Sequence, residues 1–117
     1  MGKKLIGRTN LSISNIGIGT APIGGWPNAL EEDKAIDLLE TAWENGIRYF
    51  DTAPLYGFGM AEERLGKFLK NKKKDDYVLS TKVGRIIIDS DKKEREEAFF
   101  KGAPNREPFF DFSYDAT

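Results

Sequence analysis

The chain has 117 residues, 39% hydrophobic and 32% charged, and it contains neither cysteine nor histidine. Its 18 lysines and arginines against 19 aspartates and glutamates leave no excess positive charge for counterion release from a nucleic acid. The missing residue types exclude disulfides, thiolate nucleophiles, zinc-thiolate sites, imidazole ligands and Ser-His pairs. Any acid–base chemistry must therefore come from Asp, Glu, Lys or Tyr.

No segment approaches the roughly 20 apolar residues that a membrane-spanning helix needs. The longest aliphatic run is residues 86–88, and residues 7–10 interrupt the N-terminus before the apolar core of a secretory signal can form. We therefore expect a soluble, cytoplasmic protein with no metal site and with neither a membrane nor a nucleic acid as partner.

The first 27 residues predict a hairpin, a strand and a loop. Short extended runs at residues 4–6 and 11–14 flank a turn-rich tetrapeptide, which predicts a β-hairpin over 4–14. Residues 15–20 alternate Ile with Gly, which predicts a strand whose bare face lets another backbone or a ligand approach. The Ala, Pro, Gly and Trp residues of 21–27 are typical of a loop.

From residue 28 onward, helix and strand signals alternate. Apolar residues at helical spacing predict a helix over about 31–45, with Asn28 as its cap and Asn45-Gly46 as its stop. A strand at 47–50, a second helix over 61–69 and a strand at 77–83 follow. Strands alternating with helices at this spacing predict right-handed βαβ crossovers and a parallel sheet, so the fold class is α/β.

Residues 85–117 differ from the rest. A charged block at 89–97 is followed by aromatic residues among Gly, Pro and Asn without periodicity. We expect a single partial domain with the hairpin at 4–14, βα units over 16–84 and one long loop over 85–117. A loop of that length is unusual in a compact domain unless it is functional or its packing partner is missing.

Asp51, Tyr56 and Lys82 are the candidate catalytic residues, because parallel α/β folds place their chemistry at or just after the C-terminal ends of strands. Alternation predicts that Asp51 and Lys82 point to the same rim of the sheet. A lysine beside a phenol lowers the tyrosine pKa from about 10, and the carboxylate would hold that lysine in place. The tyrosine then serves as a general acid or base without histidine.

Each of these residues also has a structural explanation. Asp51 precedes Thr-Ala-Pro and is suited to a turn, in which it would bond its own backbone. Tyr56 lies in a Gly-rich loop, where a tyrosine commonly packs. Lys82 in a strand can protect a sheet edge from aggregation.

Three motifs resemble the aldo-keto reductase family. They are Asp51 to Gly57, with the sequence DTAPLYG, Glu63 to Gly66, with ERLG, and Ser80 to Lys82, with STK. The resemblance extends over residues 4–84. The tail at 102–115 is similar to the branch that contains aldose, L-fucose and pyridoxal dehydrogenases.

The resemblance implies a (β/α)8 barrel and hydride transfer between NAD or NADP and a carbonyl or alcohol carbon of a small molecule, such as an aldehyde or a sugar. It assigns Asp51, Tyr56 and Lys82 to the catalytic group, with Tyr56 handling the proton. Gly19 and Thr20, together with Asp51, would lie by the nicotinamide. Trp26 would face the substrate, or alternatively anchor its own loop on the rim.

Two features depart from the family pattern. The family's further catalytic histidine is absent because the chain contains none. A complete barrel needs about 250 residues, so this chain supplies the hairpin and three of eight strands. We therefore expect the N-terminal portion of an enzyme, inactive by itself. The alternatives are a non-catalytic nucleotide-sensing or regulatory protein on the same fold and a non-functional remnant.

Overall fold

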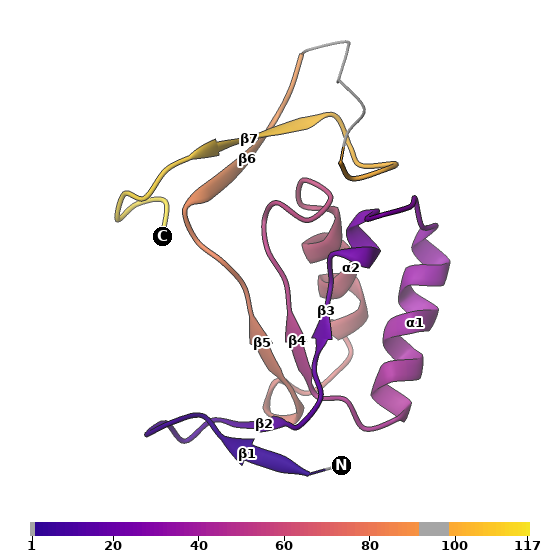
Figure 1. Cartoon of the computed structure of the whole chain (residues 1–117), viewed down its shortest axis with the longest axis vertical. Helices are drawn as coiled ribbons and strands as arrows, with labels where there is room; N and C mark the ends of the chain where they lie inside the picture. Colours follow the sequence, from indigo (N-terminus) through magenta and orange to yellow (C-terminus); the bar gives the residue numbers. More distant parts are fainter. Residues whose placement is uncertain (1, 92–98) are drawn as a thin grey trace.

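The computed structural model describes residues 2–91 and 99–117. It opens with the predicted hairpin, in which β1 (Lys3–Leu5) and β2 (Ser12–Ser14) pair antiparallel. In the turn, the Thr9 hydroxyl donates a 2.7 Å hydrogen bond to the Ile6 carbonyl. The hairpin lies across the end of the sheet at which the parallel strands begin (Figure 1).

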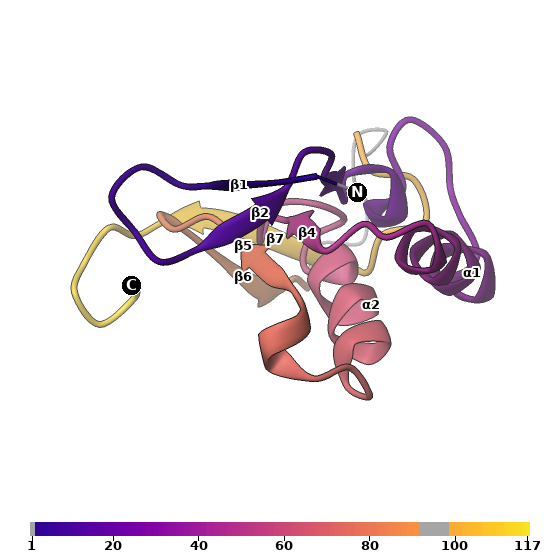
Figure 2. The same cartoon turned by 90° about the horizontal axis from the view of Figure 1, so that it is seen from below.

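The predicted parallel sheet is confirmed. Its three strands are β3 (Ile18–Gly19), β4 (Tyr49–Asp51) and β5 (Val78–Ser80), in the order β3-β4-β5. Each is shorter than the sequence predicted. Both α-helices lie to one side of this sheet (Figures 1 and 2).

The two helices occur where their apolar periodicity predicted, as α1 (Glu32–Glu44) and α2 (Met60–Leu69). The prediction that Asn28 caps α1 is wrong. Glu31 occupies the cap position and its side chain makes no capping hydrogen bond. Acidic residues in the first turn instead interact favourably with the helix dipole. Single 3₁₀ turns precede α1 and β5, as η1 (Pro22–Gly24) and η2 (Lys74–Asp76).

Phe50 lies at the centre of the core. It is 0% exposed and packs between β4 and the helices, with its ring stacked 6.4 Å from that of Trp43. The apolar side chains buried around it come from η1, α1 and α2, and include Ile23, Leu39, Leu65, Phe68 and Leu69. The helices therefore cover Phe50 on one face of the sheet, whereas Leu79, its neighbour on β5, remains 47% exposed.

The prediction of one long loop over 85–117 is wrong. Strands β6 (Arg85–Asp89) and β7 (Arg106–Phe110) pair antiparallel, with Ile87 opposite Pro108. The aliphatic run in β6 favours a strand, but its partner lies many residues away, so local periodicity cannot reveal the pairing. Of the predicted charged block, residues 92–97 lie outside the described residues.

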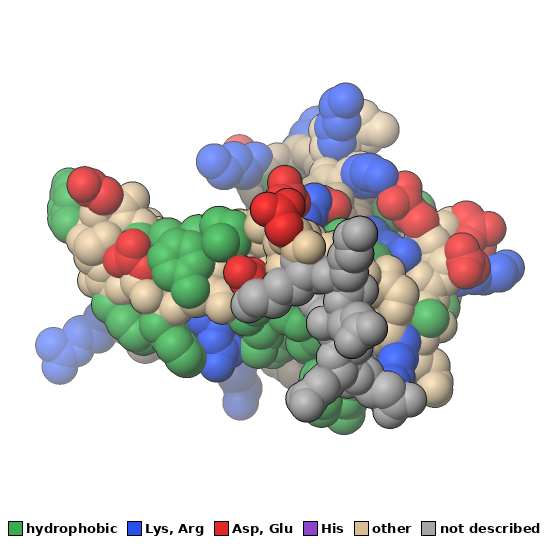
Figure 3. All heavy atoms as spheres, turned by 90° about the horizontal axis from the view of Figure 1, so that it is seen from above, with side chains coloured by type: hydrophobic (Ala, Val, Ile, Leu, Met, Phe, Trp, Pro, Cys, Tyr) green, Lys and Arg blue, Asp and Glu red, His purple; other side chains and the backbone are tan. Residues whose placement is uncertain are grey.

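The β6–β7 pair lies above the C-terminal ends of the parallel strands (Figure 1). Arg106 ties it to the α2 region, because its guanidinium donates to Glu63 Oε1 at 2.6 Å and to the Phe58 carbonyl at 3.3 Å. Seen from this end, hydrophobic side chains are exposed on the surface, and those of the pair include Ile88, Phe109 and Phe110 (Figure 3). Among the described residues, no helix has the length and apolar character needed to cross a membrane.

We expect Phe50→Ala to lower the free energy of unfolding by about 3–5 kcal/mol, because it removes the ring on which both helices pack. The free energy of unfolding is measured by urea denaturation, monitored by circular dichroism. Phe112→Ala is the control, since that ring is 73% exposed and its loss should change stability by no more than about 0.5 kcal/mol. Equal losses in the two variants would contradict the assignment of Phe50 to the centre of the core.

Candidate active site

Side-chain alternation along β4 builds the polar face of the sheet. Phe50 points to the helices, whereas Tyr49 and Asp51 point to the opposite side. Ser80, opposite Asp51 on β5, donates a 2.6 Å hydrogen bond to its Oδ1. Because the Ser80 proton is used in that bond, the Tyr49 hydroxyl donates in the 3.1 Å contact between the two hydroxyls.

Lys82 completes this network. Its Nζ lies 2.8 Å from Asp51 Oδ2 and 3.0 Å from the carbonyl oxygen of Thr52. The predicted meeting of a carboxylate and an ammonium at one rim is thus confirmed. Both side chains remain open to solvent, with 37% of Asp51 and 50% of Lys82 exposed.

The ion pair favours the charged form of both partners. The hydrogen bond from Lys82, reinforced by that from Ser80, lowers the pKa of the Asp51 carboxyl below its ordinary value. The hydrogen bond to Asp51 raises the pKa of Lys82, with smaller contributions from the neighbouring Tyr56. Lys82 therefore carries a positive charge at neutral pH.

Tyr56 is held in the loop between β4 and α2. Its backbone N–H donates to the Ala53 carbonyl at 3.1 Å, and its ring centre lies 5.2 Å from Lys82 Nζ. The next residue, Gly57, has φ +64°, a conformation that favours glycine. A Cβ built on Gly24 would lie 2.8 Å from the Gly57 nitrogen, so the two loops touch backbone to backbone beside Tyr56.

Gly19 and Thr20 differ in what they offer a ligand. A Cβ built on Gly19 would meet no atom within 4 Å, so this glycine leaves open space above the strand. Thr20 is fully buried, and its hydroxyl donates to the Asp51 carbonyl at 3.0 Å. The Thr20 hydroxyl therefore fixes the backbone of Asp51 and is not directed at the open side.

Trp26 lies against the start of the second described segment, residues 99–117. Its ring, 42% exposed, stacks on that of Phe99 with a centroid distance of 5.8 Å. Neither Lys82 nor Tyr56 contacts it in the described aromatic and cation–π interactions. The geometry thus agrees with Trp26 anchoring its loop against the later part of the chain.

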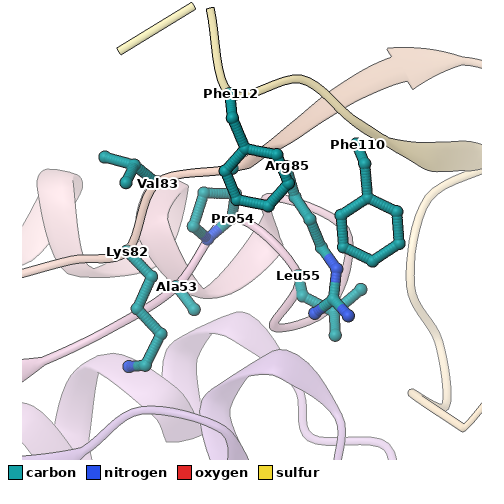
Figure 4. A pocket seen from close by; sticks show the side chains of 9 residues that line it. Ala53, Pro54, Leu55, Lys82, Val83, Arg85, Phe110 and Phe112 are labelled. Carbon is teal, nitrogen blue, oxygen red and sulfur yellow. The ribbon is translucent and has the colours of Figure 1, made fainter.

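A cavity of about 130 Å³ adjoins Lys82 (Figure 4). The side chain of Lys82 runs along its edge, with the ammonium pointing away from the cavity. On the other side the Arg85 guanidinium lies 4.9 Å from the ring centre of Phe110. The rest of the lining is mostly apolar and includes Ala53, Pro54, Leu55, Val83 and Phe112. The cavity therefore contacts the carbon chain of Lys82 and not its charge.

Two further residues of this region, Ser80 and Phe100, are not among the candidate site residues predicted from the sequence. Ser80 bonds Asp51 directly, and the available signal was its position two residues before Lys82, on the same face of the strand predicted over 77–83. Phe100, which is buried, packs with its ring centre 6.2 Å from that of Tyr56. No local pattern distinguishes Phe100 from the other aromatic residues of the tail.

We expect the Asp51 carboxyl to titrate below its ordinary value of 3.8, and Lys82→Met to raise this midpoint. Because the folded-state pKa of Asp51 lies below that ordinary value, the ion pair contributes its full stabilisation above the unfolded-state pKa. This stabilisation is lost as the pH falls through the lower folded-state pKa. NMR titration of the Asp51 carboxyl carbon measures this midpoint in the unchanged chain and in Lys82→Met. Lys67→Met, which removes a lysine paired at 2.7 Å with Glu32, is the control; a midpoint unaffected by Lys82→Met would contradict the coupling.

Comparison with known proteins agrees with this geometry. Residues 15–103 match the model of the aldo/keto reductase family. The chain is 40% identical to pyridoxal 4-dehydrogenase of Microbacterium luteolum over 97% of its own length and 35% of that protein. It is 51% identical to D-threo-aldose 1-dehydrogenase of a Pseudomonas species, over 66% of this chain and 23% of that protein.

The chain is also similar to part of several solved structures. An aldo-keto reductase from Bacillus halodurans superimposes with a TM-score of 0.65 and 36% identity, over 73% of this chain and 26% of that one. Such neighbours are (β/α)8 barrels, and the hairpin with three parallel strands corresponds to part of one. The chain spans about a third or less of the length of these relatives. It belongs to the aldo/keto reductase family of oxidoreductases.

Proposed function

We propose that this chain carries the proton-transfer residues of an NAD(P)-dependent oxidoreductase acting on a carbonyl or alcohol carbon of a small molecule. The observation that supports the proposal is the position of Lys82, whose Nζ lies 2.8 Å from Asp51 and 5.2 Å from the ring centre of Tyr56. A carboxylate, an ammonium and a phenol thus lie close together in a chain of 117 residues that contains no histidine.

Each residue has a distinct role in this mechanism. Tyr56 donates its proton to the substrate oxygen during carbonyl reduction and takes it back during alcohol oxidation. The Lys82 ammonium stabilises the negative charge that develops on the phenol oxygen when the proton leaves. Asp51 holds Lys82 in place and keeps it charged, and Ser80 orients the Asp51 carboxylate through its 2.6 Å hydrogen bond.

The described residues fit a flat ring over the open side of the sheet. Gly19 has no side chain to block such a ring, and an added Cβ there would meet nothing within 4 Å. Thr20 supports the same place indirectly, through its bond to the Asp51 backbone. A nicotinamide of NAD or NADP, when bound, supplies or accepts the hydride. We propose Gly19 and Asp51 as its neighbours in this part of the site.

The names of two relatives support a proposal for the substrate class. Pyridoxal 4-dehydrogenase and D-threo-aldose 1-dehydrogenase are named for an aldehyde and for sugars. We propose a small aldehyde or aldose for the enzyme to which this chain corresponds. Trp26, 42% exposed and stacked on Phe99, is proposed to reach such a substrate only from the rim of the site.

Residues 1–117 alone should give no detectable hydride transfer, because they lack the family's catalytic histidine and supply three strands of a barrel. The measurement is nicotinamide oxidation or reduction with aldehydes and aldoses, followed by absorbance. Tyr56→Phe provides the background rate. Turnover above that background would contradict this expectation.

A chimera tests the proposed roles directly. Residues 1–117 replace the matching part of pyridoxal 4-dehydrogenase, to which they are 40% identical. In an active chimera, Tyr56→Phe should slow the hydride step by about 10²–10⁴-fold, because the substrate oxygen loses its proton donor. The affinity for the nicotinamide cofactor should be nearly the same in the chimera and in its Tyr56→Phe variant. Single-turnover kinetics with a deuterated nicotinamide measures the step.

Two further variants sharpen this experiment. Lys82→Met should cause a loss of similar size, and combining it with Tyr56→Phe should add little, because residues that act as a unit are not additive. Tyr77→Phe is the matched control, since Tyr77 packs against Trp43 on the helix side. Near-normal hydride transfer in the Tyr56→Phe chimera would refute the role of Tyr56.

A further inference from the structure

Phe100, near the start of the second described segment (residues 99–117), contacts the loop that carries Tyr56. It is 4% exposed, and its ring centre lies 6.2 Å from that of Tyr56 and 5.8 Å from that of Phe58. The planes of Phe100 and Tyr56 are inclined by 49° and those of Phe100 and Phe58 by 83°. Tilted and edge-to-face arrangements at these distances are favourable aromatic contacts.

The backbone holds Phe100 there. The N–H of the next residue, Lys101, donates to the Gly25 carbonyl at 2.8 Å. Gly25 adopts φ +92° and leaves no room for a Cβ against Lys101. A few residues later, Arg106 donates to the Phe58 carbonyl at 3.3 Å. The segment is thus fixed to both loops that surround Tyr56.

Phe100 is separate from the main core. The buried cluster between the sheet and the helices does not include it. Phe68 has the same exposed fraction, 4%, but packs against Phe50 and Trp43 within that cluster. The described ring contacts of Phe100 are with Tyr56, Phe58 and Phe99. Its burial therefore serves the loop that carries Tyr56.

We propose that Phe100 is a positioning residue for Tyr56, holding the phenol ring within reach of Lys82. A proton donor must lie within hydrogen-bond distance of its acceptor, and small misplacements of reacting groups reduce rates strongly. The Tyr56 ring has Lys82 Nζ at 5.2 Å and Phe100 at 6.2 Å. Tyr56 also packs against the main core cluster, so removing the Phe100 ring takes away the support on one side of the phenol and increases its freedom to change rotamer. The functional meaning of this contact rests on the role proposed for Tyr56.

NMR of residues 1–117 with labelled tyrosine and phenylalanine rings tests the contact. The chain has four tyrosines, and Tyr56→Phe identifies the Tyr56 signals by their loss. The unchanged chain should show nuclear Overhauser effects between the Tyr56 and Phe100 rings. Phe100→Leu should move the Tyr56 ring signals most of the way to the values of a mobile tyrosine. Phe68→Leu, the same substitution at an equally buried site, should leave them in place.

The outcomes separate positioning from general stability. Unmoved Tyr56 signals in folded Phe100→Leu, or equal movement in Phe68→Leu, would overturn the proposal. If Phe100→Leu fails to fold, Phe100→Met replaces it, because the unbranched methionine side chain adapts better to an irregular site. Absence of the Overhauser effects in the unchanged folded chain would refute the contact without any variant. None of these signals depends on turnover, so a failed contact is distinguishable from a failed role of Tyr56 in the chimera.

Discussion

The alternation of side chains along β4 is the constraint on which the rest of this structure depends. Phe50 points to one face of the sheet and is completely buried beneath α1 and α2. Its neighbour Asp51 points to the other face and gathers Lys82 and Ser80. A shift of one residue in the pairing of β4 would exchange the two faces. Core and candidate site are therefore fixed by the same register.

The polar network contributes more to chemistry than to stability. An ion pair as exposed as Asp51 and Lys82 adds roughly 0–1 kcal/mol to folding. Its effect on charge is clearer, because the hydrogen bond between the partners lowers the pKa of the carboxyl and raises that of the ammonium. The Thr20 hydroxyl donates to the backbone carbonyl of Asp51, and the Thr52 carbonyl accepts a hydrogen bond from Lys82. Such an arrangement keeps a positive charge next to the Tyr56 ring.

Local patterns predicted the parts of the molecule that local interactions build. The hairpin follows from its turn residues, the helices from apolar spacing, and the meeting of Asp51 with Lys82 from strand alternation. The pairing of β6 with β7 joins segments separated by residues 90–105, and no periodicity reports such a distant partner. Phe100 was missed for the same reason, because only the folded chain shows that its ring lies by Tyr56. The Asn28 cap failed since α1 begins at Glu32, leaving Asn28 outside the first turn.

The backbone contact between Gly24 and Gly57 joins the two loops that follow β3 and β4. Arg64 of α2 strengthens this connection, since it donates to the Ile23 carbonyl at 2.7 Å from a buried position. Neither loop can change its path without displacing the other. An insertion in one of these loops would therefore displace its neighbour. Loop exchange between homologues should therefore transfer both loops as one unit.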